Sequence, residues 1–182
     1  RIFDGAYESG FLWATVHCRT VEQKYIGPSH WPFLTKLVQQ YPDRLIFGSG
    51  DIFEVGDIFA MMQKTGVHAV SVARGCIGNP WIFMQAKQMM RGEQPTPPTL
   101  EQQRHTLVDH FRLCTALHGE TGGSRMMRKF GIRFSVHHQH AELVRKAFVS
   151  VGSADDWKRV LDSCYLSDPP QECDESPPSG HH

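Results

Sequence analysis

The chain has 182 residues, 40% of them apolar, and its 19 basic and 19 acidic side chains leave a formal net charge of zero. This apolar content is enough for a buried core, and the length allows one domain or one domain with part of a second. The sequence has no apolar run near the ~18 residues that a membrane-spanning helix needs, and it does not open with a signal-peptide pattern. We therefore expect a cytoplasmic protein without a membrane partner.

The cysteine and histidine patterns argue against two further kinds of site. The five cysteines are an odd number and include no CxxC pair, so we expect reduced thiols rather than a disulfide framework or a zinc site. His137, His138 and His140 are close in sequence but lack an HExxH or cysteine partner pattern. The sequence therefore predicts no metal.

The start of the chain has the pattern of a helix end followed by a strand. The first residue is Arg1 and not a methionine, so we expect that further sequence lies upstream. An apolar run over residues 12–16 predicts a strand, and His17 follows it directly. A histidine at the end of a strand either faces a ligand or bonds to a backbone carbonyl group, and both interpretations stay open for His17.

Two further apolar runs, over residues 45–47 and 69–72, predict strands, and a helix over residues 52–65 separates them. Strand, helix and strand in this order form the βαβ unit of a parallel sheet. The carboxyl ends of the two strands should therefore lie side by side, at the edge where α/β proteins bind their ligands.

Small and charged residues follow both strands. Ser49 and Gly50 follow the first, and Ala73 and Arg74 follow the second. Such residues let an anion approach the backbone N–H groups closely, and Arg74 adds positive charge. The pattern indicates half of a phosphate-binding mouth, although each run alone is as typical of an ordinary turn. Asp51 belongs either to this mouth or to the next helix as its cap.

The pattern changes after a helix over residues 82–90, for which Asn79 is the expected cap. Residues 93–98 contain three prolines, which cannot continue a helix, and we expect a linker there. The sequence then predicts helices alone, over residues 100–117, 124–136, 141–148 and 154–165, with a loop over residues 119–123. Within the second of these helices, four apolar residues are expected to face the core: Met126, Met127, Phe130 and Phe134.

Charge is unevenly distributed over this second region. Residues 121–150 contain six basic residues and one acid, whereas residues 167–182 contain four acids and no Lys or Arg. The excess of basic residues indicates a polyanionic partner, or else the solvated surface of an ordinary helical bundle. Arg125, Arg128 and Lys129 are spaced i, i+3 and i+4, so they should project from one face of a helix. The last 16 residues, 167–182, have the composition of a disordered tail.

Several motifs together resemble one enzyme family. VHCRT at residues 16–20, YIG at 25–27, GSGDI at 48–52 and GNPWIF at 78–83 are similar, in order and spacing, to the C-terminal half of tRNA-dihydrouridine synthases, nearest the bacterial DusB type. The resemblance implies an enzyme that uses FMN as cofactor and NADPH as reductant to reduce the C5–C6 bond of uridine in tRNA. It also implies an α/β fold, in which residues 1–92 form the C-terminal part of a (β/α)₈ barrel and residues 99–166 a helical tRNA-binding domain.

The resemblance assigns roles to individual residues. His17 matches the histidine beside the flavin ring, and Ser49, Gly50 and Asp51 match an Asn-Gly-Asp run. Ala73 and Arg74 match the Gly-Arg pair that holds the flavin phosphate, and Arg125, Arg128 and Lys129 match the basic run that contacts tRNA. Ser49 and Ala73 depart from the family pattern. Ala73 adds a methyl group where the backbone should approach the phosphate closely.

The family's general acid is a cysteine in an Asn-x-x-Cys-Pro motif, and this sequence has no such motif. The resemblance therefore assigns no catalytic residue to the chain, and we expect that the chain alone does not reduce uridine. Two alternatives remain at this stage. One is another FMN barrel oxidoreductase, such as a dihydroorotate or dihydropyrimidine dehydrogenase, and the other is a non-catalytic RNA-binding module or remnant.

Overall fold

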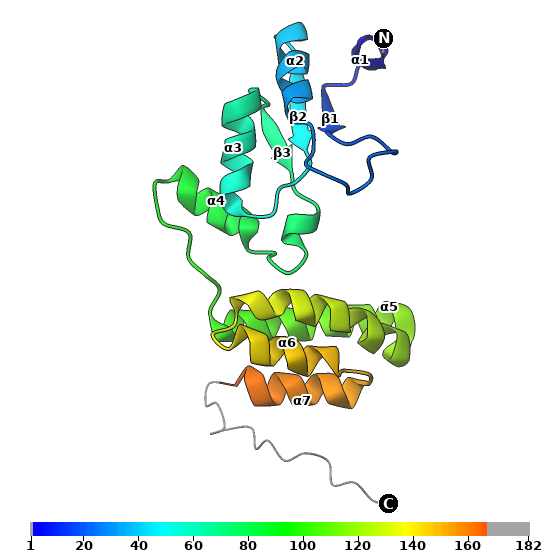
Figure 1. The fold of residues 1–182 in the computed structure, drawn as a ribbon, viewed down its shortest axis with the longest axis vertical. Helices are drawn as coiled ribbons and strands as arrows, with labels where there is room; N and C mark the ends of the chain where they lie inside the picture. Colours follow the sequence, from blue (N-terminus) through cyan, green and yellow to red (C-terminus); the bar gives the residue numbers. More distant parts are fainter. Residues whose placement is uncertain (1, 167–182) are drawn as a thin grey trace, which may run out of the picture. The chain divides into compact units, whose positions relative to one another are not determined.

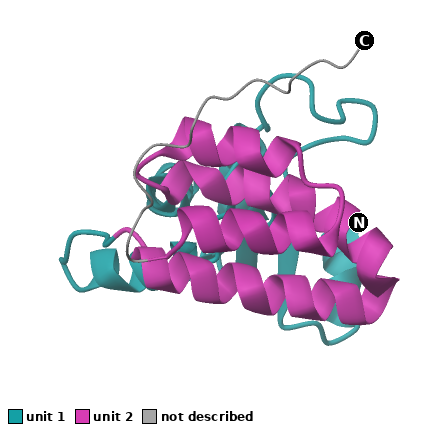
Figure 2. Cartoon of the chain, turned by 90° about the horizontal axis from the view of Figure 1, so that it is seen from below, with its two compact units in different colours: residues 1–96 teal, residues 97–182 magenta. Residues whose placement is uncertain are grey.

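The computed structural model describes residues 2–166, so the tail expected over residues 167–182 lies outside the described residues. The chain divides into two compact units, Arg1–Thr96 and Pro97–His182 (Figures 1 and 2). Unit 1 contains strands and helices, whereas the described part of unit 2 contains helices alone. None of the described helices is long and apolar enough to cross a membrane.

Unit 1 is built on a parallel sheet of three strands in the order β1-β2-β3. The strands are β1 (Trp13–His17), β2 (Leu45–Ser49) and β3 (Ala69–Ser71), which confirms the three predicted strands with small shifts at their ends. In the register of the sheet, Ser49 pairs with His17 on one side and with Ser71 on the other. The carboxyl ends of all three strands therefore lie in one row.

Helices follow the strands in the alternating order that the sequence predicts. Both βαβ crossovers are visible in Figure 1, with α2 between β1 and β2 and α3 between β2 and β3. The helices of unit 1 are α1 (Ile2–Glu8), α2 (Pro32–Gln40), α3 (Val55–Thr65) and α4 (Ile82–Met90), and a short 3₁₀ turn, η1 (Arg74–Cys76), follows β3.

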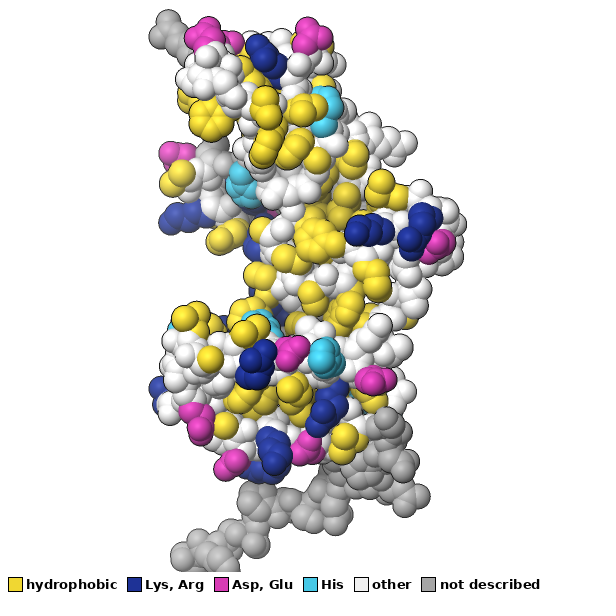
Figure 3. All heavy atoms as spheres, turned by 180° about the vertical axis from the view of Figure 1, so that it is seen from behind, with side chains coloured by type: hydrophobic (Ala, Val, Ile, Leu, Met, Phe, Trp, Pro, Cys, Tyr) yellow, Lys and Arg dark blue, Asp and Glu magenta, His cyan; other side chains and the backbone are white. Residues whose placement is uncertain are grey.

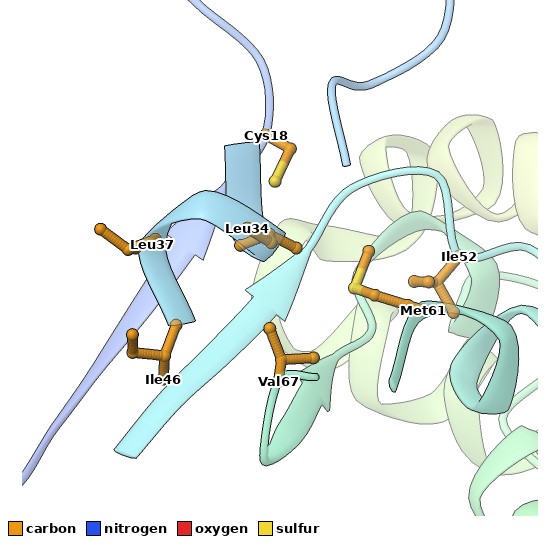
Figure 4. Packing of buried hydrophobic residues seen from close by; sticks show 7 residues of the cluster. All are labelled: Cys18, Leu34, Leu37, Ile46, Ile52, Met61 and Val67. Atoms are coloured by element: carbon orange, nitrogen blue, oxygen red, sulfur yellow. The ribbon is translucent and has the colours of Figure 1, made fainter. Parts of the chain in front are cut away.

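The core of unit 1 lies between the sheet and helices α2 and α3. Its fully buried side chains include Leu34 from α2, Ile46 from β2 and Met61 from α3 (Figure 4). Gly48 makes this close packing possible, because a Cβ atom there would lie 2.5 Å from the sulfur of Met61 and 2.9 Å from a methyl group of Leu34. The apolar pattern of the sequence therefore defines the core, and a glycine in the middle strand sets its thickness.

The expected cap of α4, Asn79, is wrong, and of the two roles left open for Asp51 the structure excludes the helix cap. Helix α3 begins at Val55, and its amino end is closed by Asp57, whose Oδ2 accepts hydrogen bonds from the N–H groups of Phe53 and Glu54 at 2.9 Å. Asp51 lies too far upstream to cap this helix, and its carboxylate is occupied elsewhere. Asn79 does not cap α4 either, because the N-cap residue of this helix is Trp81 and the Asn79 amide donates instead to Oε1 of Gln85 at 3.1 Å.

The residues between α4 and α5 contain no helix or strand, as the prolines predict. Thr96 is nevertheless held in place, because its backbone N–H and its hydroxyl group bond to the side chain of Gln88 at 3.0 Å each, and its carbonyl accepts from Gln85. On the other side, the carbonyl of Pro98 accepts a hydrogen bond from Gln103 at 3.0 Å. Each end of this linker is therefore fixed to its own unit.

Unit 2 begins with α5 (Leu100–Phe134), which reverses at Gly119, a residue with a φ of 72°. Contacts on either side of Gly119 pair residues progressively farther from it. Gly123 approaches Thr115, the rings of His110 and Phe130 lie 4.5 Å apart, and Gln103 donates to the carbonyl of His137. The helix is therefore a hairpin of two arms, which correspond to the two predicted helices, with a shorter turn than expected.

Helices α6 (Ala141–Val149) and α7 (Ala154–Cys164) complete this bundle, and a 3₁₀ turn, η2 (Ser135–His137), precedes them. Figure 2 shows the helices of unit 2 side by side. Trp157 is at the centre, with its ring 5.1 Å from that of Phe111 and 5.0 Å from that of Phe148. Met127 and Phe134 are buried as predicted, and Phe130 is partly buried, but Met126 is 40% exposed, which corrects its expected place in the core.

Candidate functional site

A pocket lies at the carboxyl ends of the three strands, and we call it the strand-end pocket. It contains all six residues that the sequence assigns to a cofactor. His17 comes from the end of β1, Ser49 from the end of β2, and Ser71 from the end of β3. The full lining is His17, Ser49, Gly50, Asp51, Ile52, Phe53, Ser71, Ala73 and Arg74. The parallel sheet therefore brings the predicted residues together, although their binding role remains a prediction.

His17 lies between this pocket and a second one. Its Nδ1 is 3.3 Å from the hydroxyl oxygen of Ser49, the residue opposite it in the sheet. On its other side, His17 borders a cavity of about 240 Å³ that Cys18, Gln23, His30 and Phe33 help to line. The imidazole is exposed and its orientation is fixed from one side, so it can contact a ligand in either pocket.

Asp51 connects three segments of unit 1. Its Oδ2 accepts from Nη2 of Arg19 and from the N–H group of Ser29, both at 2.7 Å, and its Oδ1 accepts from Nη2 of Arg74 at 3.0 Å. Burial alone would raise the pKa of the Asp51 carboxyl, but the Ser29 N–H and the Arg19 guanidinium outweigh burial and hold the pKa below its ordinary value. Asp51 therefore carries its negative charge throughout the neutral range.

Arg74 is oriented by two aromatic rings as well as by Asp51. Its guanidinium carbon lies 4.7 Å from the centroid of the Tyr25 ring and 5.2 Å from that of the Phe53 ring. These are cation–π distances, and stacking leaves the edge of a guanidinium free to donate hydrogen bonds. The Arg74 side chain is 35% exposed, so it is accessible from the strand-end pocket.

Glycine is needed at Gly75 for packing. A Cβ atom on Gly75 would lie 2.2 Å from the carbonyl oxygen of Ile52, so only glycine lets η1 approach the loop after β2 this closely. This contact explains how Arg74 and Asp51 come together from separate strands. The turn η1 begins at Arg74, so the N–H groups of Arg74 and Gly75 have no acceptor within it.

Arg19, Tyr25 and Ser29 are parts of the site to which the sequence assigned no role, although Arg19 and Tyr25 lie in the motifs VHCRT and YIG. Arg19 follows a predicted strand by three residues, and this position was a signal for it. Tyr25 and Ser29 lie in an irregular loop without periodicity, and only the folded chain brings them to Asp51 and Arg74. Ser71 lies inside a predicted strand, where no pattern distinguishes it.

Neither Cys18 nor Cys76, which follow β1 and β3, lines the strand-end pocket. Cys18 is buried, and burial raises the pKa of its thiol to about 11, so it stays protonated and weakly reactive at neutral pH. Cys76 lies in η1, where its Sγ–H group contacts the carbonyl oxygen of Ala73 at 2.9 Å.

His138, in the histidine cluster of unit 2, has a structural role. His138 is buried, its Nδ1 accepts from the N–H of His140 at 2.9 Å, and its Nε2 donates to the carbonyl of Cys164 at 2.8 Å. Both ring nitrogens are thus used within the bundle, and neither is available to a metal. Among residues 2–166, no group of three or more His, Cys, Asp or Glu side chains could hold a metal ion.

The second arm of α5 presents a basic face. Met127, Gly131 and Phe134 point into the bundle, whereas Arg125, Arg128 and Lys129 are exposed. Five ion pairs use other charged residues of unit 2, but none within residues 2–166 involves these three cations. Figure 3 shows basic side chains on the surface of unit 2. Their position is therefore compatible with an anionic partner.

The whole described chain matches one family model. The model for "Dihydrouridine synthase (Dus)" covers residues 1–168. The chain belongs to the dihydrouridine synthase family. The resemblance drawn from the sequence motifs is thereby confirmed.

Comparison with individual members of the family shows what share of their length this chain spans. The chain is 35% identical over 159 residues to a probable tRNA-dihydrouridine synthase of Mycobacterium tuberculosis, covering 86% of this chain and 41% of that protein. It is 34% identical over 127 residues to a probable tRNA-dihydrouridine synthase of Treponema pallidum, which covers 68% of this chain and 37% of that protein. It is 30% identical over 165 residues to tRNA-dihydrouridine synthase B of Xanthomonas axonopodis, which covers 88% of this chain and 48% of that protein. The chain thus spans less than half the length of these dihydrouridine synthases.

Proposed function

We propose that this chain is part of a tRNA-dihydrouridine synthase, an FMN enzyme that uses NADPH to reduce the C5–C6 bond of uridine in tRNA. The observation that carries the proposal is the meeting of the predicted cofactor residues in the strand-end pocket of a chain from this family. Strands β1, β2 and β3 would then be the last three strands of a (β/α)₈ barrel, whose ligands bind at the carboxyl ends of its strands. Unit 2 would be the tRNA-binding domain.

The residues present fit the phosphate end of FMN. Arg74 supplies a positive charge in a fixed orientation, and the hydroxyl groups of Ser49 and Ser71 lie in the same pocket. Ala73 is exposed, so its methyl group can be directed toward solvent rather than against the phosphate. Asp51 contributes by holding Arg74, since a carboxylate would repel a phosphate.

When bound, FMN supplies the hydride that the uracil ring accepts. The chain's own residues would bind the cofactor and orient it. Arg74 would hold the phosphate, and His17, steadied by Ser49, would border the flavin ring. Because the sequence has no Asn-x-x-Cys-Pro motif and neither Cys18 nor Cys76 lines the strand-end pocket, we propose that the chain alone does not catalyse the reduction. Dihydrouridine formation from tRNA and NADPH by the purified chain would contradict this part of the proposal.

The experiment that tests the cofactor site is an FMN titration, followed by flavin fluorescence, on the chain and on two variants. Arg74→Ala removes a charge-assisted hydrogen bond worth roughly 1.5–3 kcal/mol, so the affinity for FMN should fall by about ten- to a hundred-fold. Arg91→Ala is the matched control, because Arg91 is 63% exposed and pairs only with the nearby Glu93 among the described residues. Equal loss of affinity in both variants, or none in Arg74→Ala, would show that Arg74 does not hold the phosphate.

The exposed basic face of α5 supports a second candidate, an RNA-binding module that holds no flavin. Binding of tRNA without any change in flavin fluorescence would favour that candidate. Binding of both ligands would favour the synthase. The family match and the basic face on the helical unit favour both candidates over a dihydroorotate or dihydropyrimidine dehydrogenase.

A further inference from the structure

Arg19 is the most deeply buried charged side chain at the strand-end pocket. Only 6% of its side chain is exposed, and Nη2 donates to both carboxylate oxygens of Asp51, at 2.7 and 2.9 Å. A guanidinium in this position is costly to bury unless it is paired. The positive charge of Arg19 is therefore paired with the negative charge of the Asp51 carboxylate.

Arg19 also closes the loop that follows β1. Its Nη2 donates to the carbonyl oxygen of Gly27 at 2.7 Å, and its Nη1 donates to that of Lys24 at 3.2 Å. The same loop returns to the site through Ser29, whose N–H donates to Asp51, and through Trp31, whose indole N–H donates to the carbonyl of Gly50 at 3.0 Å. Arg19 and Asp51 thus fix the loop that carries Tyr25, the ring that stacks on Arg74.

The charges at this site do not cancel. Arg19 and Arg74 carry one positive charge each, and Asp51 carries one negative charge, so the three side chains together leave +1. Without Arg19, the pair of Asp51 and Arg74 would be neutral. A neutral pair attracts a phosphate only weakly, because Arg74 would be shared between the carboxylate and the incoming anion.

We propose that Arg19 is a positioning residue of the anion site: it neutralises Asp51, so that Asp51 can orient Arg74 without cancelling the charge that Arg74 offers to a phosphate. This inference rests on the proposed function, because it concerns the same pocket. Arg19 itself does not line the strand-end pocket and acts through Asp51.

A double-mutant cycle on the full chain tests the proposal through four proteins: the wild type, Arg19→Met, Asp51→Asn and the double variant. Their net site charges are +1, 0, +2 and +1, respectively. Asparagine is well suited to position 51, because the backbone there has a φ of 53°, a conformation that asparagine tolerates. The measurement is the affinity for inorganic phosphate and for FMN, by calorimetry and fluorescence, at low and at physiological salt.

We expect Arg19→Met to weaken binding of both anions by about ten-fold, the effect of one charge a few ångströms away at an intermediate effective dielectric constant. Asp51→Asn should bind at least as tightly as the wild type at low salt, because it raises the net site charge to +2 while the amide oxygen can still accept the hydrogen bond from Arg74. The double variant should regain most of the affinity that Arg19→Met loses, because it has the wild-type net charge. The dependence of affinity on salt should follow the same order.

A merely structural role for Arg19 gives the opposite pattern. Both single variants would then bind more weakly, the double variant would bind no better than Arg19→Met, and the salt dependence would not change in step with charge. That pattern overturns the proposal, and so does equal binding by the wild type and Arg19→Met. If Arg19→Met does not fold, as judged by circular dichroism, the comparison of Asp51→Asn with the wild type decides: weaker binding by Asp51→Asn at low salt overturns the proposal.

Failure of the proposed function gives a distinct result. A folded wild-type chain that binds neither phosphate nor FMN would overturn the cofactor site itself, and the role of Arg19 with it. A wild type that binds both, with an Arg19→Met variant that binds equally well, would overturn only the role of Arg19.

Discussion

The two units differ in how completely they bury their apolar surface. In unit 2, the aromatic residues meet at Trp157, and the described helices close around them. In unit 1, β1 is an edge strand, and no strand within residues 2–166 pairs with its outer side. Leu12 is 73% exposed and Trp13 is 52% exposed at this edge. The described part of unit 2 therefore has a closed core, whereas the sheet of unit 1 has an unpaired edge at β1 among the described residues.

The largest test of this comparison is to produce the units separately. Residues 97–182 should give a monomer that unfolds in one cooperative transition, because the core of unit 2 is closed. Residues 1–96 should aggregate or associate, because an unpaired strand edge with exposed apolar side chains offers pairing to other chains. Size-exclusion chromatography and thermal melts followed by circular dichroism measure both. A monomeric, cooperatively folded unit 1 would contradict the comparison.

The next test concerns how tightly the core of unit 2 is packed. A Cβ atom on Gly131 would lie 2.4 Å from the ring of Phe148, which is fully buried. Gly131→Ala should therefore destabilise the bundle by about 1–3 kcal/mol, the usual cost of overpacking a core. The measurement is urea unfolding of residues 97–182 or of the full chain.

Gly122→Ala is the matched control for that variant. A Cβ atom on Gly122 would meet only the Cβ of His118, at 3.6 Å, which is an ordinary contact. This variant should be neutral or stabilising by up to about 1 kcal/mol, because alanine favours the helix. Equal stability of the two variants would mean that helix α6 moves away from α5 without cost.

A third prediction compares ligand binding at the basic face of unit 2 with ligand binding at the anion site of unit 1. Changing Arg125, Arg128 and Lys129 together to alanine should weaken tRNA binding. It should also lower the slope of log affinity against log salt by roughly one for each phosphate that a removed side chain had neutralised. Different tRNAs should be affected about equally, because binding to phosphates carries no base information. FMN binding should not change. A variant that keeps its tRNA affinity and its salt slope would place the RNA elsewhere.

The smallest expected effect is a loss of stability of unit 2 in mild acid. Burial is the main cause that lowers the pKa of His138 below its ordinary value of 6.5, and the nearby His140 adds to it, while the hydrogen bond to the Cys164 carbonyl opposes it. The unfolded chain therefore takes up the proton first. The contribution of His138 to stability is complete above pH 6.5 and is lost as the pH falls through that value toward the folded pKa.

Protonation of His138 would also remove the hydrogen bond that Nδ1 accepts from His140, a bond worth about 0.5–1.5 kcal/mol. Urea unfolding at about pH 7.5 and about pH 5, on either side of the ordinary histidine pKa, should show a loss of this size, larger than in a His138→Gln variant. His110, whose pKa burial also lowers, contributes with the same sign and remains in that variant. If His138→Gln does not change the difference in the free energy of unfolding between the two pH values, the effect belongs to His110 and other groups.

The sequence by itself determined the elements and their order, together with the residues at the strand ends. Apolar periodicity defined the three strands and the helices, and the small residues after them located Ser49, Gly50, Ala73 and Arg74, because these signals lie within a few neighbouring residues. The exposed face of Arg125, Arg128 and Lys129 followed in the same way from helical spacing.

Only the tertiary structure decided which distant residues meet. Asp51 lies 32 residues from Arg19 and 23 from Arg74, and its choice of these partners rather than the nearby helix end depends on how the loops fold back over the sheet. The approach of Gly75 to Ile52 and of Gly131 to Phe148 depends in the same way on packing. Local patterns contain no information about such contacts, because their energy depends on shape and charge brought together across the fold.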